Sequence, residues 1–203
     1  MKKFEGYQKG VNLGGWLSQC VAYTEEHFNN FITEEDIKRI KSFGLDHVRV
    51  PVDYDVFMKE QGDLDVVNSE GISHIDDCIG WCRKHGLNMI LDLHKAKGYM
   101  FDAGAVPDAD VFFEDEMLQQ TFYDTWEMFA ARYGKDKDIL AFELLNEVVN
   151  PDYESKWNEI ATKAIGKIRA IAPDSYIIVG GVNYNNVFAV PGIKVPIDEK
   201  TVF

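Results

Sequence analysis

Apolar residues along the chain fall into two alternating patterns. The first consists of short runs rich in Val, Ile and Leu, which predict β-strands. These runs cover residues 10–16, 46–52, 87–94, 139–147 and 175–181. The runs are nearly continuous rather than alternating, which is typical of parallel strands that are buried on both faces under helices.

The second pattern places apolar residues three and four positions apart, which predicts amphipathic helices. These segments cover residues 32–44, 71–86, 118–134 and 155–173. The first begins at Thr33, a good N-cap residue, with Asp36 three positions later as in a capping box. Gly44, Gly86 and Gly134 end the first three segments, and Pro173 follows the last one.

The alternation of strands and helices predicts an α/β fold with a parallel sheet. Two architectures fit this order, an open doubly wound sheet and a (β/α)8 barrel. The stretch that leads out of the first strand, Asn-Leu-Gly-Gly-Trp-Leu-Ser-Gln, lacks the Gly-x-Gly-x-x-Gly pattern, which argues against a dinucleotide-binding fold, and no P-loop is found. With 203 residues, one domain is expected.

Polar residues gather at the carboxyl ends of the predicted strands. Arg49 lies in the second strand, His94 ends the third, and Asn146 and Glu147 end the fourth. The carboxyl ends of the strands form the active-site face of a (β/α)8 barrel. A carboxyl in apolar surroundings has a raised pKa, as the general acid of a glycosidase needs. Taken one at a time, these residues could equally be helix caps, ion pairs or strand-end side chains.

Glu143 lies four residues before Glu147, and in a regular strand the two side chains point to the same face. We interpret Glu143 as a structural carboxylate. Trp16, Tyr99 and Tyr184 could stack against sugars, but packing within the core or a loop is the expected role for each.

Charge and composition exclude several classes of partner. The net charge of −13 argues against nucleic acid and anionic membranes, which bind basic surfaces. No apolar run is long enough to span a membrane. No apolar stretch follows the lysines at the amino terminus, so no signal peptide is predicted, and the chain is cytoplasmic or was secreted with its signal removed. The 3 Cys and 5 His residues show no metal-binding spacing.

Five segments together resemble glycoside hydrolase family 5, the family of cellulases and β-glucanases. In chain order they are GVNLGGWLSQ, FGLDHVRVPVDYDVF, GLNMILDLHKAKGY, FELLNEVVNPD and IIVGGVNYNN. The resemblance extends over nearly the whole chain and is greatest to compact clostridial endoglucanases. The Glu that follows Gly-Gly-Trp in exo-β-1,3-glucanases of the family is absent here, so the resemblance favours endo action.

The resemblance implies a TIM barrel and retaining hydrolysis of β-1,4 or mixed-linkage glucan, without metal or cofactor. It implies that Glu147 is the acid/base and that Asn146 contacts the sugar. His94 and Arg49 are then supports of the site.

The family's His-x-Tyr motif on strand six and its nucleophilic Glu on strand seven have no counterpart here. We therefore expect residues 1–203 to be the N-terminal portion of a single barrel domain, with about five of the eight βα units. Such a portion is expected to expose apolar side chains of the barrel. The expected side chains are Val48, Ile90, Leu91, Leu140 and Leu144 or their neighbours. A homo-oligomer or a complementary C-terminal half would then cover them.

Two alternatives remain open at this point. The chain could be a non-catalytic barrel fragment that at most binds carbohydrate weakly. It could also be a different barrel enzyme in which Glu147 acts with Asp102, Asp108 or Glu114 of the loop after the third strand.

Overall fold

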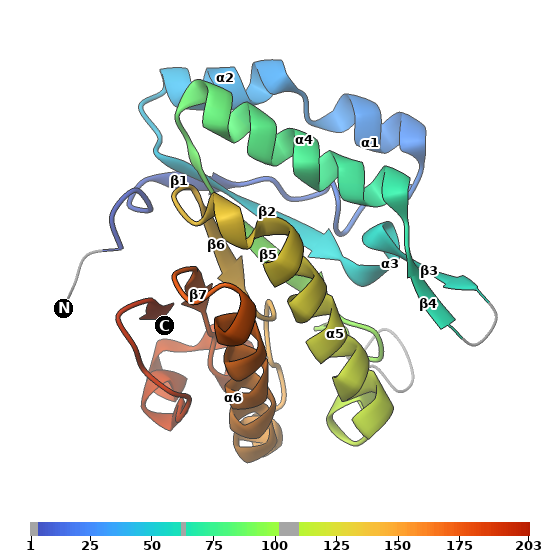
Figure 1. Ribbon diagram of the computed structural model, residues 1–203, viewed down its shortest axis with the longest axis vertical. Helices are drawn as coiled ribbons and strands as arrows, with labels where there is room; N and C mark the ends of the chain where they lie inside the picture. Colours follow the sequence, from blue (N-terminus) through green and yellow to red (C-terminus); the bar gives the residue numbers. More distant parts are fainter. Residues whose placement is uncertain (1–3, 62–63, 102–109) are drawn as a thin grey trace. The chain divides into compact units, whose positions relative to one another are not determined.

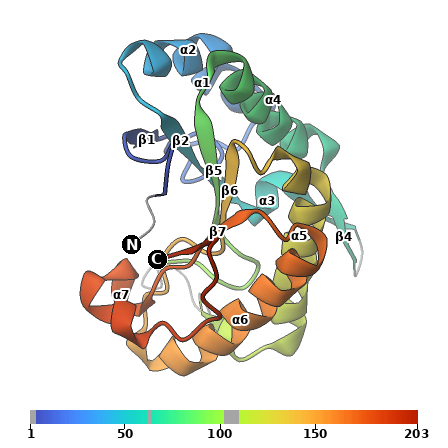
Figure 2. The ribbon, with the colours of Figure 1, turned by 60° about the vertical axis from the view of Figure 1, so that its left-hand side comes forward.

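The computed structural model describes residues 4–61, 64–101 and 110–203, and Figures 1 and 2 show it from two sides. The chain divides into two compact units, Met1–Leu91 and Asp92–Phe203. The boundary between them falls within strand β5 (Asn88–Lys95). Each unit is an α/β arrangement of parallel strands and helices.

In the first unit, strands follow the order β1-β2-β5, and β1 (Gly10–Asn12) runs parallel to β2 (His47–Asp53). The helices are α1 (Glu25–Phe31), α2 (Glu34–Ser42), α3 (Tyr54–Phe57) and α4 (Ser69–His85). A separate antiparallel hairpin consists of β3 (Met58–Gln61) and β4 (Leu64–Val67). Helices α2 and α4 lie side by side in both views (Figures 1 and 2).

In the second unit, the strand order is β5-β6-β7-β8, with β6 (Leu140–Glu143), β7 (Tyr176–Ile178) and β8 (Thr201–Val202) parallel to one another. Helices α5 (Glu116–Tyr133) and α6 (Glu154–Ile171) pack side by side (Figure 1). The shorter elements are η1 (Val111–Phe113), η2 (Gly134–Asp136), η3 (Pro151–Tyr153), α7 (Val182–Asn185) and η4 (Val187–Gly192). Among the helices of the described ranges, none has the length and apolar character needed to cross a bilayer.

All five predicted strands and all four predicted helices are present, but three strands are shorter than predicted. Strand β1 ends at Asn12, because Gly15 takes a left-handed φ of +78° and turns the chain. Strand β6 ends at Glu143, and β7 ends at Ile178. Helix α1 and the β3–β4 hairpin were not predicted.

The predicted start of α2 and the glycine ends of two helices are confirmed. The carboxylate of Asp36 accepts hydrogen bonds from the Thr33 N–H at 3.0 Å and the Thr33 hydroxyl at 2.8 Å. Gly44 and Gly86 have left-handed φ values of +79° and +71° after α2 and α4. Gly134 instead stays helical at φ −60°, and a Cβ on it would lie 2.6 Å from the Cβ of Ala172. Close approach, not a left-handed turn, therefore explains this glycine.

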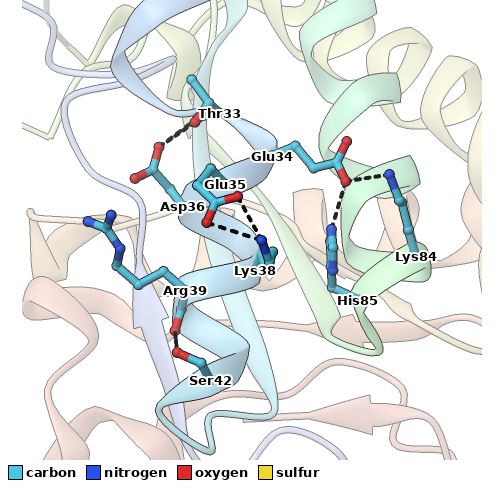
Figure 3. A network of polar contacts seen from close by, with 9 residues as sticks. All are labelled: Thr33, Glu34, Glu35, Asp36, Lys38, Arg39, Ser42, Lys84 and His85. Carbon is cyan, nitrogen blue, oxygen red and sulfur yellow. Dashed lines mark hydrogen bonds and ion pairs between the residues drawn. The ribbon is translucent and has the colours of Figure 1, made fainter.

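A charged network joins α2 to the last turn of α4 (Figure 3). Glu34 accepts hydrogen bonds from the Lys84 ammonium at 2.6 Å and from His85 at 2.8 Å. These two hydrogen bonds lower the pKa of the exposed Glu34 carboxyl. Because all three side chains are at least partly exposed to solvent, the contribution of the network to stability is small. The two basic residues also suit the negative end of the α4 dipole.

The expected exposure of apolar side chains on the strands is wrong. Val48, Ile90, Leu91, Leu140 and Leu144 are all buried. In β5, six consecutive residues are buried, so the described residues cover both faces of this strand. The exposed apolar side chains lie mostly in loops and at helix ends instead, although Val11 of β1 and Val67 of β4 are also exposed. They include Phe43, Val187, Phe188 and Ile197.

Asp198 anchors the start of β8 in the second unit. Its carboxylate accepts hydrogen bonds from the guanidinium of Arg169 on α6 at 2.7 and 3.1 Å. It also accepts from the Lys200 N–H at 2.8 Å and the Thr201 hydroxyl at 2.9 Å. Burial raises the pKa of this carboxyl. The four hydrogen bonds lower it by more than burial raises it, so the pKa falls from its ordinary 3.8 to about 2.

We expect Asp198→Asn to lower the midpoint of urea unfolding at neutral pH. A carboxyl with a depressed folded-state pKa stabilises the fold above its unfolded pKa, and this contribution is lost as pH falls from about 3.8 to about 2. The urea midpoints of Asp198→Asn and of the parent should therefore differ at pH 7 and become equal as the pH approaches 2. Asp152→Asn, which changes an exposed carboxylate of the same unit, is the control. A difference between Asp198→Asn and the parent that stays constant down to pH 2 would contradict this assignment.

Candidate active site

The segment 144–149 carries the two predicted residues Asn146 and Glu147, but it is not part of β6. The N–H of Leu144 donates to the Ile178 carbonyl of β7, and the N–H of Asn146 donates to the Leu93 carbonyl of β5, each at 3.1 Å. In a regular strand, N–H groups two residues apart point to the same side. These two point to opposite neighbours, so the regular pleat is broken between them.

This break corrects the sequence interpretation of Glu143 and Glu147. Because the strand ends at Glu143, the spacing of the two residues does not place their side chains on one face. Glu143 is buried at the end of the strand. Glu147 is only partly buried, whereas its neighbours Asn146 and Val148 are buried. The segment therefore holds one partly buried glutamate between two buried residues.

His94 lies on β5 and is held by a second buried carboxylate. Its Nδ1 is 2.6 Å from Oδ2 of Asp92, which is fully buried. The His94 ring also packs edge-on against Phe101, with 5.1 Å between ring centroids. A carboxylate on Nδ1 favours the tautomer with the proton on that nitrogen, which leaves Nε2 of the neutral ring as an acceptor.

The structure brings His94 and Asn146 together. Asn146, which follows β6, lies beside β5, since its N–H donates to the carbonyl of Leu93, the residue before His94. Sequence reasoning missed Asp92, although a signal was available. Asp92 and His94 are two residues apart in a strand and therefore share a face.

Arg49 lies in the first unit, on β2. Its Nη1 donates to Oδ1 of Asn12 at 3.0 Å, and its carbonyl accepts from the Leu13 N–H at 2.8 Å. Arg49 and Asn12 are also paired in register between the parallel strands β1 and β2. The role of Arg49 toward a carboxylate of the site stays a prediction.

The three aromatic residues differ in their environments. Trp16 is fully buried, and its indole N–H donates to the Phe28 carbonyl at 2.8 Å. Tyr99 is 3% exposed, so the packing role predicted for both residues is confirmed. Tyr184 is 58% exposed, and the expectation that it packs is wrong.

Of the acidic residues that an alternative mechanism would use, Asp102 and Asp108 lie outside the described residues. Glu114 is exposed and follows η1. Within the described ranges, no cluster of three or more His, Cys, Asp or Glu side chains is arranged to hold a metal ion.

We expect Asp92→Asn to change the tautomer of His94. An amide can donate to Nδ1, which moves the ring proton to Nε2, as the equivalent change does in serine proteases. The ¹⁵N chemical shifts of the His94 ring at pH 8 should report this exchange. The other 4 of the 5 histidines serve as internal controls. Unchanged His94 shifts would mean that Asp92 does not set the tautomer.

Residues 5–203 match the family model described as cellulase (glycosyl hydrolase family 5). Cellodextrinase A of Ruminococcus flavefaciens is 43% identical over 203 residues, which is 100% of this chain and 59% of that protein. Endoglucanase C of Acetivibrio thermocellus is 41% identical over 180 residues, 89% of this chain and 51% of that protein. The chain thus spans little more than half the length of these curated relatives.

Solved structures give the same picture of the fold. The clostridial cellulose synthase subunit Z from Clostridioides difficile superposes with a TM-score of 0.78 at 26% identity, covering 97% of this chain and 60% of that one. Endoglucanase Cel5A of Thermotoga maritima gives a TM-score of 0.78 at 24% identity, covering 97% and 59%. The predicted fold class, part of a (β/α)8 TIM barrel, is confirmed.

Proposed function

Because the chain belongs to glycosyl hydrolase family 5, the cellulase family, we propose that it contributes to an endo-β-glucanase acting on β-1,4 or mixed-linkage glucan. The observation that carries this proposal is the placement of Glu147. Its carboxylate is partly exposed after the end of β6, next to buried Asn146. The names of two relatives, a cellodextrinase and an endoglucanase, are consistent with this substrate class.

The proposed reaction is retaining hydrolysis in two steps. Glu147 first donates a proton to the glycosidic oxygen, while a second carboxylate attacks the sugar and forms a glycosyl-enzyme. Glu147 then takes a proton from water, which releases the sugar. Asn146 donates to a sugar hydroxyl. His94, oriented by Asp92, and Arg49 support the site through hydrogen bonds to sugar or carboxylate.

The second carboxylate must lie only about 5 Å from the first in a retaining enzyme. We propose that this second carboxylate comes from polypeptide other than residues 1–203. This chain covers only 59% and 51% of the two matched relatives. Residues 1–203 then form the N-terminal portion of one barrel domain, which both compact units share. A complementary C-terminal half, or a second copy of the chain, is the expected partner.

We expect the 203-residue chain alone to show no β-glucanase turnover above background. Glu147 can supply the proton, but without a nucleophilic carboxylate no glycosyl-enzyme can form. The test is reducing-sugar release from barley β-glucan, with light scattering of the same sample to report its oligomeric state. Adding the complementary half should produce turnover. Turnover by the chain alone that Glu147→Gln abolishes would contradict the proposal and favour an in-chain partner for Glu147.

In the complete enzyme, Glu147→Ala should slow hydrolysis of polysaccharide far more than hydrolysis of an aryl glycoside with an activated leaving group. A good leaving group departs without protonation, so the first step tolerates loss of the acid, whose ordinary contribution is about 10²–10⁴-fold. Added azide should then accelerate the second step by replacing base-assisted water. Steady-state rates on both substrates, with and without azide, measure this. Equal losses without an azide effect would exclude Glu147 as the acid/base.

A further inference from the structure

The segment 144–149 leaves the regular sheet while most of it stays buried. Buried peptide groups need hydrogen-bond partners, and neighbouring strands supply only some of them here. Side chains supply several of them. The first is Trp126 of α5, whose indole N–H donates to the Leu144 carbonyl at 3.1 Å.

Tyr99 bridges the two sides of Val148. Its hydroxyl donates to the carbonyl of Glu147 and accepts from the N–H of Val149 at 3.0 Å. The ring is almost completely buried and packs edge-on against Phe113, with 5.3 Å between centroids. Burial raises the pKa of the Tyr99 phenol, and the charge of Glu147 raises it further, although the Val149 hydrogen bond lowers it. The hydroxyl therefore keeps its proton and remains a donor at neutral pH.

A strained turn after β7 holds the same segment from another direction. Asn183, Tyr184 and Asn185 have consecutive left-handed φ values of 57°, 60° and 53°. Non-glycine residues rarely adopt this conformation, and such strain persists where surrounding contacts enforce it, often at functional sites.

The contacts of this turn meet the backbone on both sides of Glu147. The side-chain amide of Asn185 donates to the Asn146 carbonyl, and the N–H of Tyr184 donates to the Val148 carbonyl at 3.3 Å. Val182, just before the turn, forms a parallel bridge with Val148. Gly180 leaves room for the arrangement, because a Cβ there would lie 2.0 Å from Oδ1 of Asn185.

We propose that Tyr99 and Asn185 are positioning residues for Glu147. Together with the left-handed turn 183–185, they form what we term the Glu147 clamp. The clamp bonds the carbonyls of Asn146, Glu147 and Val148, so it fixes the peptide planes from which the Glu147 side chain projects. This inference rests on the proposed role of Glu147 as acid/base. A proton donor must lie within hydrogen-bond reach of the leaving oxygen, and a displacement of about 1 Å can lower the rate about 10²-fold.

The test uses two clamp variants with matched controls in the complete enzyme. Tyr99→Phe removes the bridging hydroxyl, and Asn185→Gly removes the amide while relieving its left-handed strain. Tyr123→Phe removes a phenol hydroxyl on α5, and Gln19→Gly relieves the left-handed strain of a residue outside the clamp, whose φ is 54°. Each clamp variant should lower kcat on a cello-oligosaccharide by roughly 10–100-fold with little change in KM. The kcat/KM on an activated aryl glycoside, which reports only the first step, should fall by less than about 3-fold, because that leaving group needs little protonation. Both controls should keep kcat within about 2-fold.

Glu147→Gln, assayed in parallel, separates the two proposals. If it shows the leaving-group dependence and the clamp variants do not, the clamp is wrong and the function stands. If Glu147→Gln itself shows no leaving-group dependence, both the proposed role of Glu147 and the clamp are wrong.

Hydrogen exchange of the 203-residue chain gives a readout that needs no activity. The amide of Val149 should exchange at least about 10-fold faster in Tyr99→Phe than in Tyr123→Phe, because it loses its hydrogen-bond acceptor. Equal exchange rates in the two variants would overturn the role of Tyr99.

Discussion

A buried peptide group that leaves a sheet must find a new partner, and this requirement governs the segment from Leu144 to Val149. The strand ends at Glu143, but burial continues through Val148. Each unpaired buried carbonyl or N–H would destabilise the fold by ~1–3 kcal/mol. An indole, a phenol, a side-chain amide and two neighbouring strands meet this need. The same contacts that satisfy the backbone also determine where Glu147 points.

On the adjacent strand β5, a buried side chain likewise orients a candidate site residue. Asp92 is fully buried, and its contact with Nδ1 of His94 orients the ring without exposing the acid to solvent. Thus the backbone at Glu147 and the imidazole of His94 each bond to a buried side chain, Tyr99 and Asp92 respectively. The geometry of both candidate site residues therefore depends on side chains behind them, as preorganised sites require.

Those helices and strands that depend on the local spacing of apolar residues were predictable from the sequence. The helices over α2, α4, α5 and α6 and the buried strands follow from the spacing of apolar residues, and Thr33 and Gly44 marked the ends of α2. The end of β6 was not predictable in this way, because Leu144 and Leu145 continue the apolar run after the pleat has broken. Helix α1 buries only Phe28 and so carries little pattern. Tyr99 bonds a residue 48 positions away in the sequence, and Asn185 bonds one 39 positions away. Local spacing patterns do not predict such long-range contacts.

The left-handed turn after β7 also bears on how barrels of this family can be recombined. Residues 99, 146–149 and 183–185 come from three different loops, yet they meet around one short stretch of backbone. A chimera with a crossover between Tyr99 and Asn185 would take these loops from different parents. Even where each loop is well formed, the inherited phenol, amide and turn need not match. Gene-shuffling libraries should therefore keep these three loops as a single block.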